Sequence, residues 1–207
     1  DVPLLAKLLD AVPGGMLILN INRQIVFANR SALKIAGLDN LLSTLGLRPG
    51  EAMQCIHSAD EKWGCGTSEF CRTCGAVKAI LASQEGRSDV QECRVLRKPE
   101  GEALDLRVWT TPLLINSMAL TIFALMDISD EKRRKALERI FFHDILNTAS
   151  GIKGFAELLK DADSGEVKQY QETIFSLARM IVDEINSQRT LTAAENNELK
   201  LNPSKVR

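Results

Sequence analysis

The stretch Gly15-Met-Leu-Ile-Leu-Asn-Ile-Asn-Arg-Gln-Ile-Val-Phe-Ala28 decides how the first half of the chain folds. Two apolar runs, 15–21 and 24–28, are separated by Asn22 and Arg23, a length typical of a hairpin turn. We therefore expect two strands here. A short helix over 29–36 should follow, and Gly37 should end it.

Downstream of this hairpin, the sequence predicts a helix from Thr67 to about Ser83 and three more strands over 90–96, 103–114 and 118–126. Turn residues at 98–101 and 116–117 separate these strands. Residues 1–128 therefore indicate an α+β domain whose single antiparallel sheet, with short helices, could wrap a small cavity.

From Asp130 the pattern is helical almost to the end. One stripe follows the spacing of a bundle seam, a second stripe follows the break at 161–165, and two helices alone cannot bury both. We expect a helical hairpin over 141–194 that forms a dimeric four-helix bundle, with a monomeric pair packed on the first domain as the alternative. Residues 129–140, rich in Lys and Arg, are expected to be a solvated linker helix. The two stripes are Phe141, Ile145, Thr148, Ile152, Phe155 and Leu159, then Tyr170, Ile174, Leu177, Ile181 and Ile185.

Composition excludes several classes of protein. The 207 residues carry a net charge of −1, which argues against nucleic acid as a partner. No apolar run reaches the roughly 18 residues that a membrane helix requires. We expect a cytoplasmic protein with no membrane segment in this chain.

His143 is one of only two histidines. It lies two residues from both Phe141 and Ile145, so on a helix it points away from the seam. Asp144 is adjacent and Asn147 lies one turn further on. A solvent-facing imidazole can act as a nucleophile while a neighbouring carboxylate takes its other ring proton. A surface histidine without a role is the alternative.

The segment Phe142-His-Asp-Ile-Leu-Asn147, followed by Gly151-Ile-Lys-Gly-Phe155, resembles the H-box of sensor histidine kinases in its HDxxN form. The resemblance implies that His143 is the phosphoacceptor and Asp144 its acid/base partner. It also implies that Asn147 orients the water that dephosphorylates a response-regulator receiver domain. Many members carry Pro where this chain has Thr148, so the helix should bend less here.

The first half resembles a PAS domain. Residues 9–20 are similar to its opening helix and strand, and residues 25–33 to its second strand and the helix beyond. Asp127-Ile-Ser129 is similar to the Asp-Ile-Thr ending from which a signalling helix leaves. Together the two resemblances imply a fragment of a sensor histidine kinase, with phosphate coming from ATP through an ATP-binding domain that this chain lacks. The tail over 195–207 would lead toward that domain. A non-catalytic dimeric PAS adaptor is the alternative.

Four of the five cysteines lie in the segment 50–75, and Cys93 follows on a later strand. Thiolates at such spacing could hold zinc or an iron–sulfur cluster. A redox pair of Cys71 with Cys74, or cysteines without a ligand, are the alternatives. His57 is a further candidate ligand, and also the only first-domain imidazole available to a haem. Cys93 is expected to be a small core residue. The four predicted metal ligands are Cys55, Cys65, Cys71 and Cys74.

Overall fold

The computed structural model describes residues 7–98, 103–195 and 198. It divides into two compact units, residues 1–132 and 133–207. The turn predicted at 98–101 lies outside the described residues apart from Lys98. The predicted tail also lies outside them, apart from Glu195 and Glu198.

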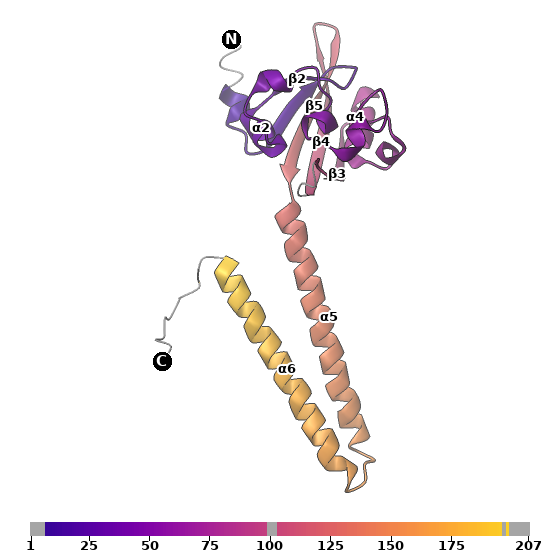
Figure 1. Ribbon diagram of the computed structural model, residues 1–207, viewed down its shortest axis with the longest axis vertical. Coiled ribbons are helices and arrows are strands. Elements are labelled where there is room, and N and C mark those ends of the chain that lie inside the picture. Colours follow the sequence, from indigo (N-terminus) through magenta and orange to yellow (C-terminus); the bar gives the residue numbers. More distant parts are fainter. Residues whose placement is uncertain (1–6, 99–102, 196–197, 199–207) are drawn as a thin grey trace. The chain divides into compact units, whose positions relative to one another are not determined.

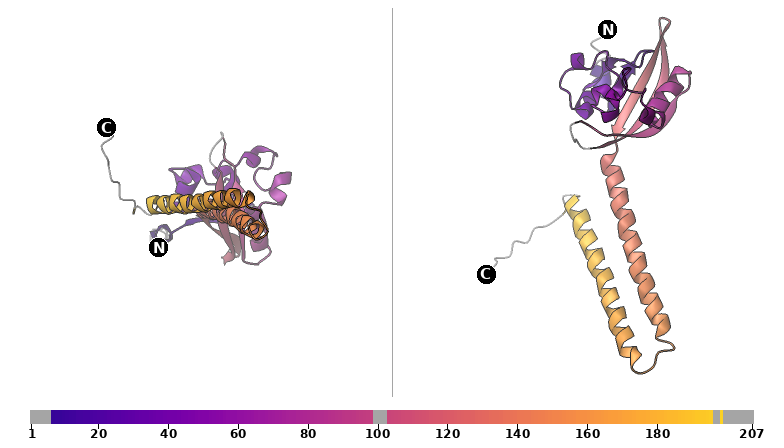
Figure 2. Two further views of the ribbon diagram at one scale, coloured as in Figure 1. Left: turned by 90° about the horizontal axis from the view of Figure 1, so that it is seen from below. Right: turned by 45° about the vertical axis from the view of Figure 1, so that its right-hand side comes forward.

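The first unit is built on a five-stranded antiparallel sheet in the order β2-β1-β5-β4-β3 (Figure 1). Strands from opposite ends of this unit pair at its centre, where Leu17 of β1 lies opposite Phe123 of β5. The far end of the β4–β5 hairpin extends beyond the neighbouring strands (Figures 1 and 2). The expected α+β architecture is confirmed. The strands are β1 (Gly15–Leu19), β2 (Ile25–Ala28), β3 (Asp89–Val95), β4 (Leu104–Ile115) and β5 (Met118–Asp127).

Six short helices connect β2 to β3. Of these, α2 packs on β1, while α4 packs on β3, β4 and β5. They are α2 (Arg30–Ala36), η1 (Leu41–Ser43), α3 (Pro49–Ala52), η2 (Ile56–Ala59), η3 (Glu69–Arg72) and α4 (Gly75–Gln84).

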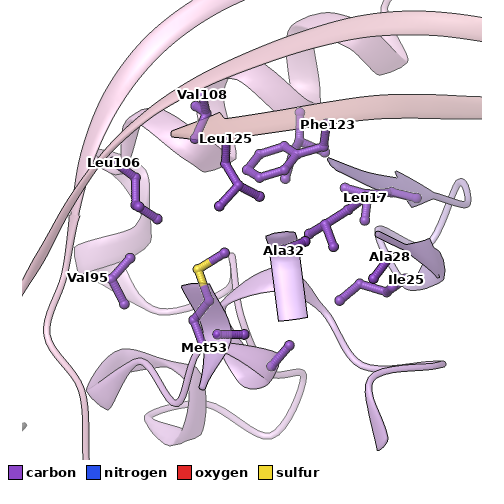
Figure 3. Close-up of a cluster of buried hydrophobic side chains, with 14 of the residues drawn as sticks. Leu17, Ile25, Ala28, Ala32, Met53, Val95, Leu106, Val108, Phe123 and Leu125 are labelled. Carbon is purple, nitrogen blue, oxygen red and sulfur yellow. The ribbon is translucent and has the colours of Figure 1, made fainter. Parts of the chain in front are cut away.

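Burial alternates along the strands, as a sheet with one face on the core requires. In β5, Thr121, Phe123 and Leu125 are buried, and the residues between them are more exposed. Figure 3 shows Phe123 and Leu125 in one cluster with side chains from β1, β2 and the helices. Each large apolar side chain buried in this way stabilises the fold by roughly 1.5–3 kcal/mol.

Asn29 joins the start of α2 to the first strand. Its Oδ1 accepts hydrogen bonds from the backbone N–H groups of Met16 and Ala32, each at 2.9 Å. Its Nδ2 donates to the carbonyl oxygens of Leu9 and Gly14, each at 3.0 Å. Because the side chain is 1% exposed, these four bonds meet its entire hydrogen-bonding capacity without water.

The β1–β2 connection is longer than the predicted two-residue turn, because β1 ends at Leu19. Asn20 causes the difference: its side-chain oxygen accepts from the backbone N–H groups of Asn22 and Gln24, both at 2.9 Å. Such a local bond competes with strand pairing. Arg23 completes the turn at φ 64°, in the left-handed region.

The helix predicted from Thr67 to Ser83 is two elements, η3 and α4. The chain leaves the helical conformation at Cys74, whose ψ of 120° makes it the N-cap of α4. Gly75 allows this arrangement, since a Cβ at that position would collide with the carbonyl of Glu92 on β3. The break therefore results from packing of α4 against the sheet, which local sequence does not reveal.

The second unit contains most of α5 (Ser129–Leu158) and all of α6 (Glu166–Glu195). The predicted stripes are partly buried, apart from Ile185, which is exposed. The rings of Phe155 and Tyr170 meet with their centroids 5.8 Å apart. A Cβ at Gly151 would lie 3.3 Å from Leu177 Cδ1, so the helices approach closely there. The hairpin agrees with the prediction, whereas the dimeric bundle stays a prediction.

Among the helices within the described ranges, none combines the length and apolar character needed to cross a bilayer.

Candidate functional site

His143 lies on α5 with its side chain directed into solvent. That side chain is 70% exposed, whereas Phe141 and Ile145 are half-buried. The orientation predicted from helical spacing is therefore confirmed. The imidazole is open to a macromolecular partner or to a nucleotide.

Two neighbouring side chains determine which ring nitrogen of the neutral His143 carries the proton. Asp144 Oδ1 lies 3.1 Å from Nδ1 of His143. Because a carboxylate only accepts, this contact places the proton of the neutral ring on Nδ1 and leaves the lone pair on Nε2. The side-chain Nδ2 of Asn147 lies 3.2 Å from each ring nitrogen, and as a donor it pairs with Nε2. The arrangement is that of an accessible nitrogen nucleophile with a proton acceptor behind it.

Thr148 stands where a Pro is common in the resembling family. Its Oγ1 donates to the carbonyl oxygen of Asp144 at 2.9 Å, and α5 continues unbroken to Leu158. The backbone that carries His143 thus remains regular, as predicted from the absence of Pro.

A second candidate site is a cavity of about 340 Å³ inside the first unit. All five cysteines and His57 line it. Sequence analysis placed four of the cysteines in one segment. In the structure, Cys93 of β3 joins them in the lining of the cavity. The apolar part of the lining includes Met53, Val95, Leu106 and Phe123, which surround one space in Figure 3.

The loop that carries Cys65 is fastened to the start of α3. Arg48 Nη1 donates to the carbonyl oxygens of Trp63 and Cys65 at 2.7 and 2.9 Å. Glu51 Oε1 accepts from the backbone N–H of Cys65 at 3.2 Å. A Cβ at Gly50 would lie 2.5 Å from the Cys65 sulfur, so glycine leaves the room that this thiol occupies.

Cys71 is buried, and its sulfur has two polar contacts. It accepts from the backbone N–H of Gly66 at 3.3 Å and from the hydroxyl of Ser68 at 3.2 Å. His57 is also engaged, since its Nδ1 lies 2.8 Å from Asp60 Oδ2 and its ring stacks on Phe70 at 4.3 Å.

The side chains of Cys74 and Cys93 both line the cavity and interact with each other there. This thiol–thiol interaction, together with the backbone N–H groups of Val77 and Ala76, lowers the pKa of Cys74 to about 6, against burial, which raises it. The same interaction, and then burial, raise the pKa of Cys93. Burial raises the pKa of Cys65 to about 12. The pKa of Cys74 is thus lowered, whereas those of Cys65 and Cys93 are raised.

Within the described residues, no three His, Cys, Asp or Glu side chains are placed so that they could hold a metal ion. The zinc or iron–sulfur site at Cys55, Cys65, Cys71 and Cys74 stays a prediction that this geometry does not support. Cys93 is confirmed as a core residue, at 7% exposure. Sequence reasoning missed its contact with Cys74, because that contact depends on how α4 crosses β3.

Comparison with protein families finds one match in the first unit: residues 4–74 match the model of the PAS domain. This match agrees with the PAS resemblance expected for this segment, and the H-box segment lies outside it. No curated protein sequence matches the chain.

Solved structures with a similar fold include three proteins of low identity. A PAS domain from a two-component sensor histidine kinase is 12% identical, covers 61% of this chain and 95% of its own, and has a TM-score of 0.42. The PAS domain of nitrogen regulation protein NR(II) from Vibrio parahaemolyticus is 15% identical, covers 60% and 98%, and has a TM-score of 0.44. VqmA from Vibrio cholerae is 20% identical, covers 60% and 52%, and has a TM-score of 0.45.

Proposed function

We propose that this chain is the sensory and phosphoacceptor part of a two-component sensor histidine kinase. In this proposal, a signal is received by the PAS domain, and His143 accepts phosphate from ATP and passes it to an aspartate of a response-regulator receiver domain. ATP is supplied by a separate ATP-binding domain. The exposed His143 with Asp144 at its Nδ1 is the observation that carries the proposal.

The transfer uses the two ring nitrogens differently. Nε2 of His143 attacks the γ-phosphorus of ATP, the bond to the β,γ-bridging oxygen breaks, and ADP leaves. The Nδ1 proton passes to Asp144, so the phosphorylated imidazole is neutral. In the second step a carboxylate of the receiver attacks the phosphorus, and the N–P electron pair returns to Nε2.

Asn147 serves a separate reaction in this proposal, the hydrolysis of the regulator's acyl phosphate to inorganic phosphate. Its amide lies beside Nε2, where a partner's acyl phosphate would approach. An amide there can orient water toward phosphorus without itself accepting phosphate. Replacing Asn147 by Ala should therefore reduce dephosphorylation of the regulator at least tenfold more than it reduces phosphorylation of His143. Equal losses in the two assays would contradict this role.

A second copy of the chain is the proposed partner of the hairpin. No residue of α5 is buried, and large apolar side chains of both helices remain exposed. Exposed apolar surface of this extent favours association. Light scattering should give a dimer at micromolar concentration, and a monomer would contradict the four-helix bundle. Examples are Phe142 at 61%, Leu146 at 64%, Phe175 at 72% and Met180 at 57% exposure.

Phosphorylation tests the central claim. The chain is incubated with the ATP-binding domain of a sensor histidine kinase and ATP labelled on its γ-phosphate. We expect an acid-labile, base-stable label on the wild-type chain. His143→Gln should abolish the label, and His57→Gln, which removes the other histidine, should retain it. A label that persists in His143→Gln refutes the phosphoacceptor assignment. A dimer that never becomes labelled supports the non-catalytic adaptor instead.

A further inference from the structure

We propose that Cys74 and Cys93 form a peroxide-reactive dithiol that closes to a disulfide inside the cavity of the first unit. The proposal concerns the cysteine chemistry of the PAS domain and is independent of phosphate transfer at His143.

The geometry rests on the contact between α4 and β3. Gly75 lies directly against the carbonyl of Glu92, and this close approach places the residues beside each of them, Cys74 and Cys93, in thiol–thiol contact. Both sulfurs belong to residues that line the cavity, so a small oxidant can reach them there. Cys74 is half-buried, so it suits the role of the attacking thiol that the oxidant reaches first. Cys93 is buried, so it suits the role of the protected resolving thiol.

Cys74 also has the surroundings of an attacking sulfur. It is the N-cap of α4, so its side chain lies at the amino end of that helix, in the cavity lining together with Ala76 and Val77. Partial positive charge at a helix N-terminus stabilises a thiolate. Cys71 differs, because its polar contacts are a backbone amide and the Ser68 hydroxyl. The structure therefore pairs Cys74 with Cys93, in place of the Cys71–Cys74 pair considered from sequence.

The reaction balances with a hydroperoxide as oxidant. The Cys74 thiolate attacks one peroxide oxygen, the O–O bond breaks, and the departing alkoxide takes a proton and leaves as an alcohol, or as water from hydrogen peroxide. The sulfur of Cys93 then attacks the resulting sulfenic sulfur. The hydroxyl group leaves with the Cys93 proton as water. Two thiols lose two electrons in total, and the peroxide gains them.

Closure of the disulfide should reach the beginning of α5. The two free sulfurs must approach to about 2.05 Å to form the bond, and we expect α4 and β3 to shift relative to each other as they do so. Glu92, next to Cys93, holds Arg107 at 2.8 Å and Lys132 at 3.1 Å. Lys132 lies in the first turn of α5 and also contacts Asp105 at 3.2 Å. A change at Cys93 therefore acts on β3, and the ion pair between Glu92 of β3 and Lys132 connects that strand to the first turn of α5.

The experiment uses the full chain, reduced and freed of reductant, with one equivalent of hydrogen peroxide. We expect the intact mass to fall by two hydrogens and peptide mapping to give a Cys74–Cys93 crosslink. Before oxidation, iodoacetamide at neutral pH should label Cys74 about tenfold faster than Cys65.

Variants distinguish the attacking thiol, Cys74, from the resolving thiol, Cys93. Cys93→Ser should retain a sulfenic acid at Cys74 that dimedone traps, and Cys93→Ala serves if the serine does not fold. Cys74→Ser should abolish the fast reaction, whereas Cys65→Ser, in the same cavity, should keep the crosslink. A Cys71–Cys74 crosslink overturns the proposal. Zinc or iron that copurifies and is released by peroxide, without the Cys74–Cys93 crosslink, overturns it as well.

Discussion

Replacing Asn29 by Asp removes two of the four hydrogen bonds of that side chain and adds a negative charge. The introduced carboxylate can still accept from Met16 and Ala32, but it cannot donate to the carbonyls of Leu9 and Gly14. Those two oxygens lie 3.0 Å from the present amide nitrogen, so the charge would face them directly.

The magnitude follows from these contacts. Two lost hydrogen bonds cost about 1 kcal/mol each, and a buried charge facing two carbonyls adds about 2 kcal/mol. The first unit should therefore lose about 4 kcal/mol of unfolding free energy at neutral pH. Burial, together with the two carbonyl oxygens that face it, raises the pKa of the introduced carboxyl above its unfolded value, against the two remaining N–H donors. The folded state then binds more protons than the unfolded state, and stability falls as pH rises through that raised pKa.

Urea titration followed by tryptophan fluorescence measures this change. Both tryptophans, Trp63 and Trp109, lie in the first unit, so the signal excludes the hairpin. The deficit of Asn29→Asp should shrink to about 1 kcal/mol below pH 4, where the protonated carboxyl carries no charge and can donate one of the two lost bonds. Asn29→Ala, which adds no charge, should show a deficit that does not change with pH. An aspartate variant within 1 kcal/mol of wild type, flat from pH 4 to pH 8, would refute the reasoning.

Two further predictions concern the contact surface of β3. Gly75→Val should force α4 away from Glu92, cost about 2–4 kcal/mol in urea unfolding and abolish the selective alkylation of Cys74. Gly154→Ala, where a Cβ meets nothing within 4 Å, should instead be neutral or stabilising, and an equal loss in both variants would contradict the collision. Glu92→Gln tests the ion pairs of β3. Arg107 and Lys132 lower the pKa of Glu92. The ionised carboxylate therefore stabilises the fold above the unfolded-state pKa of Glu92, and this stabilisation disappears as pH falls through the lowered folded-state pKa. The urea midpoints of variant and wild type should differ at pH 7 and converge at pH 3, and a constant difference would count against the ion pairs.

Local pattern was enough to predict the five strands and the two long helices of this chain. Alternating burial in β5 and the 3–4 spacing along α5 both come from periodicities that a single segment carries. The orientation of His143 followed for the same reason, because its position relative to Phe141 and Ile145 depends only on helix geometry.

Features that depend on two distant segments were not predictable. Cys74 and Cys93 meet only because Gly75 lets α4 lie against β3. Likewise, three of the four bonds of Asn29 need the backbone of residues 9–16 to fold back over it. The break before α4 belongs to the same class, since nothing in the sequence 67–83 alone ends a helix at Thr73.

The alternation of side chains along β3 limits how this strand can move. Cys93 is buried and Glu92 is exposed to the ion pairs, one residue apart. A slip of the strand by one residue would exchange the two environments, exposing the thiol and burying the carboxylate. A change of register is therefore excluded for this strand. It can respond to a change in the cavity only by tilting or twisting. Because Glu92 on this strand pairs with Lys132, we expect a tilt of β3 beside the cavity to shift the first turn of α5 as well.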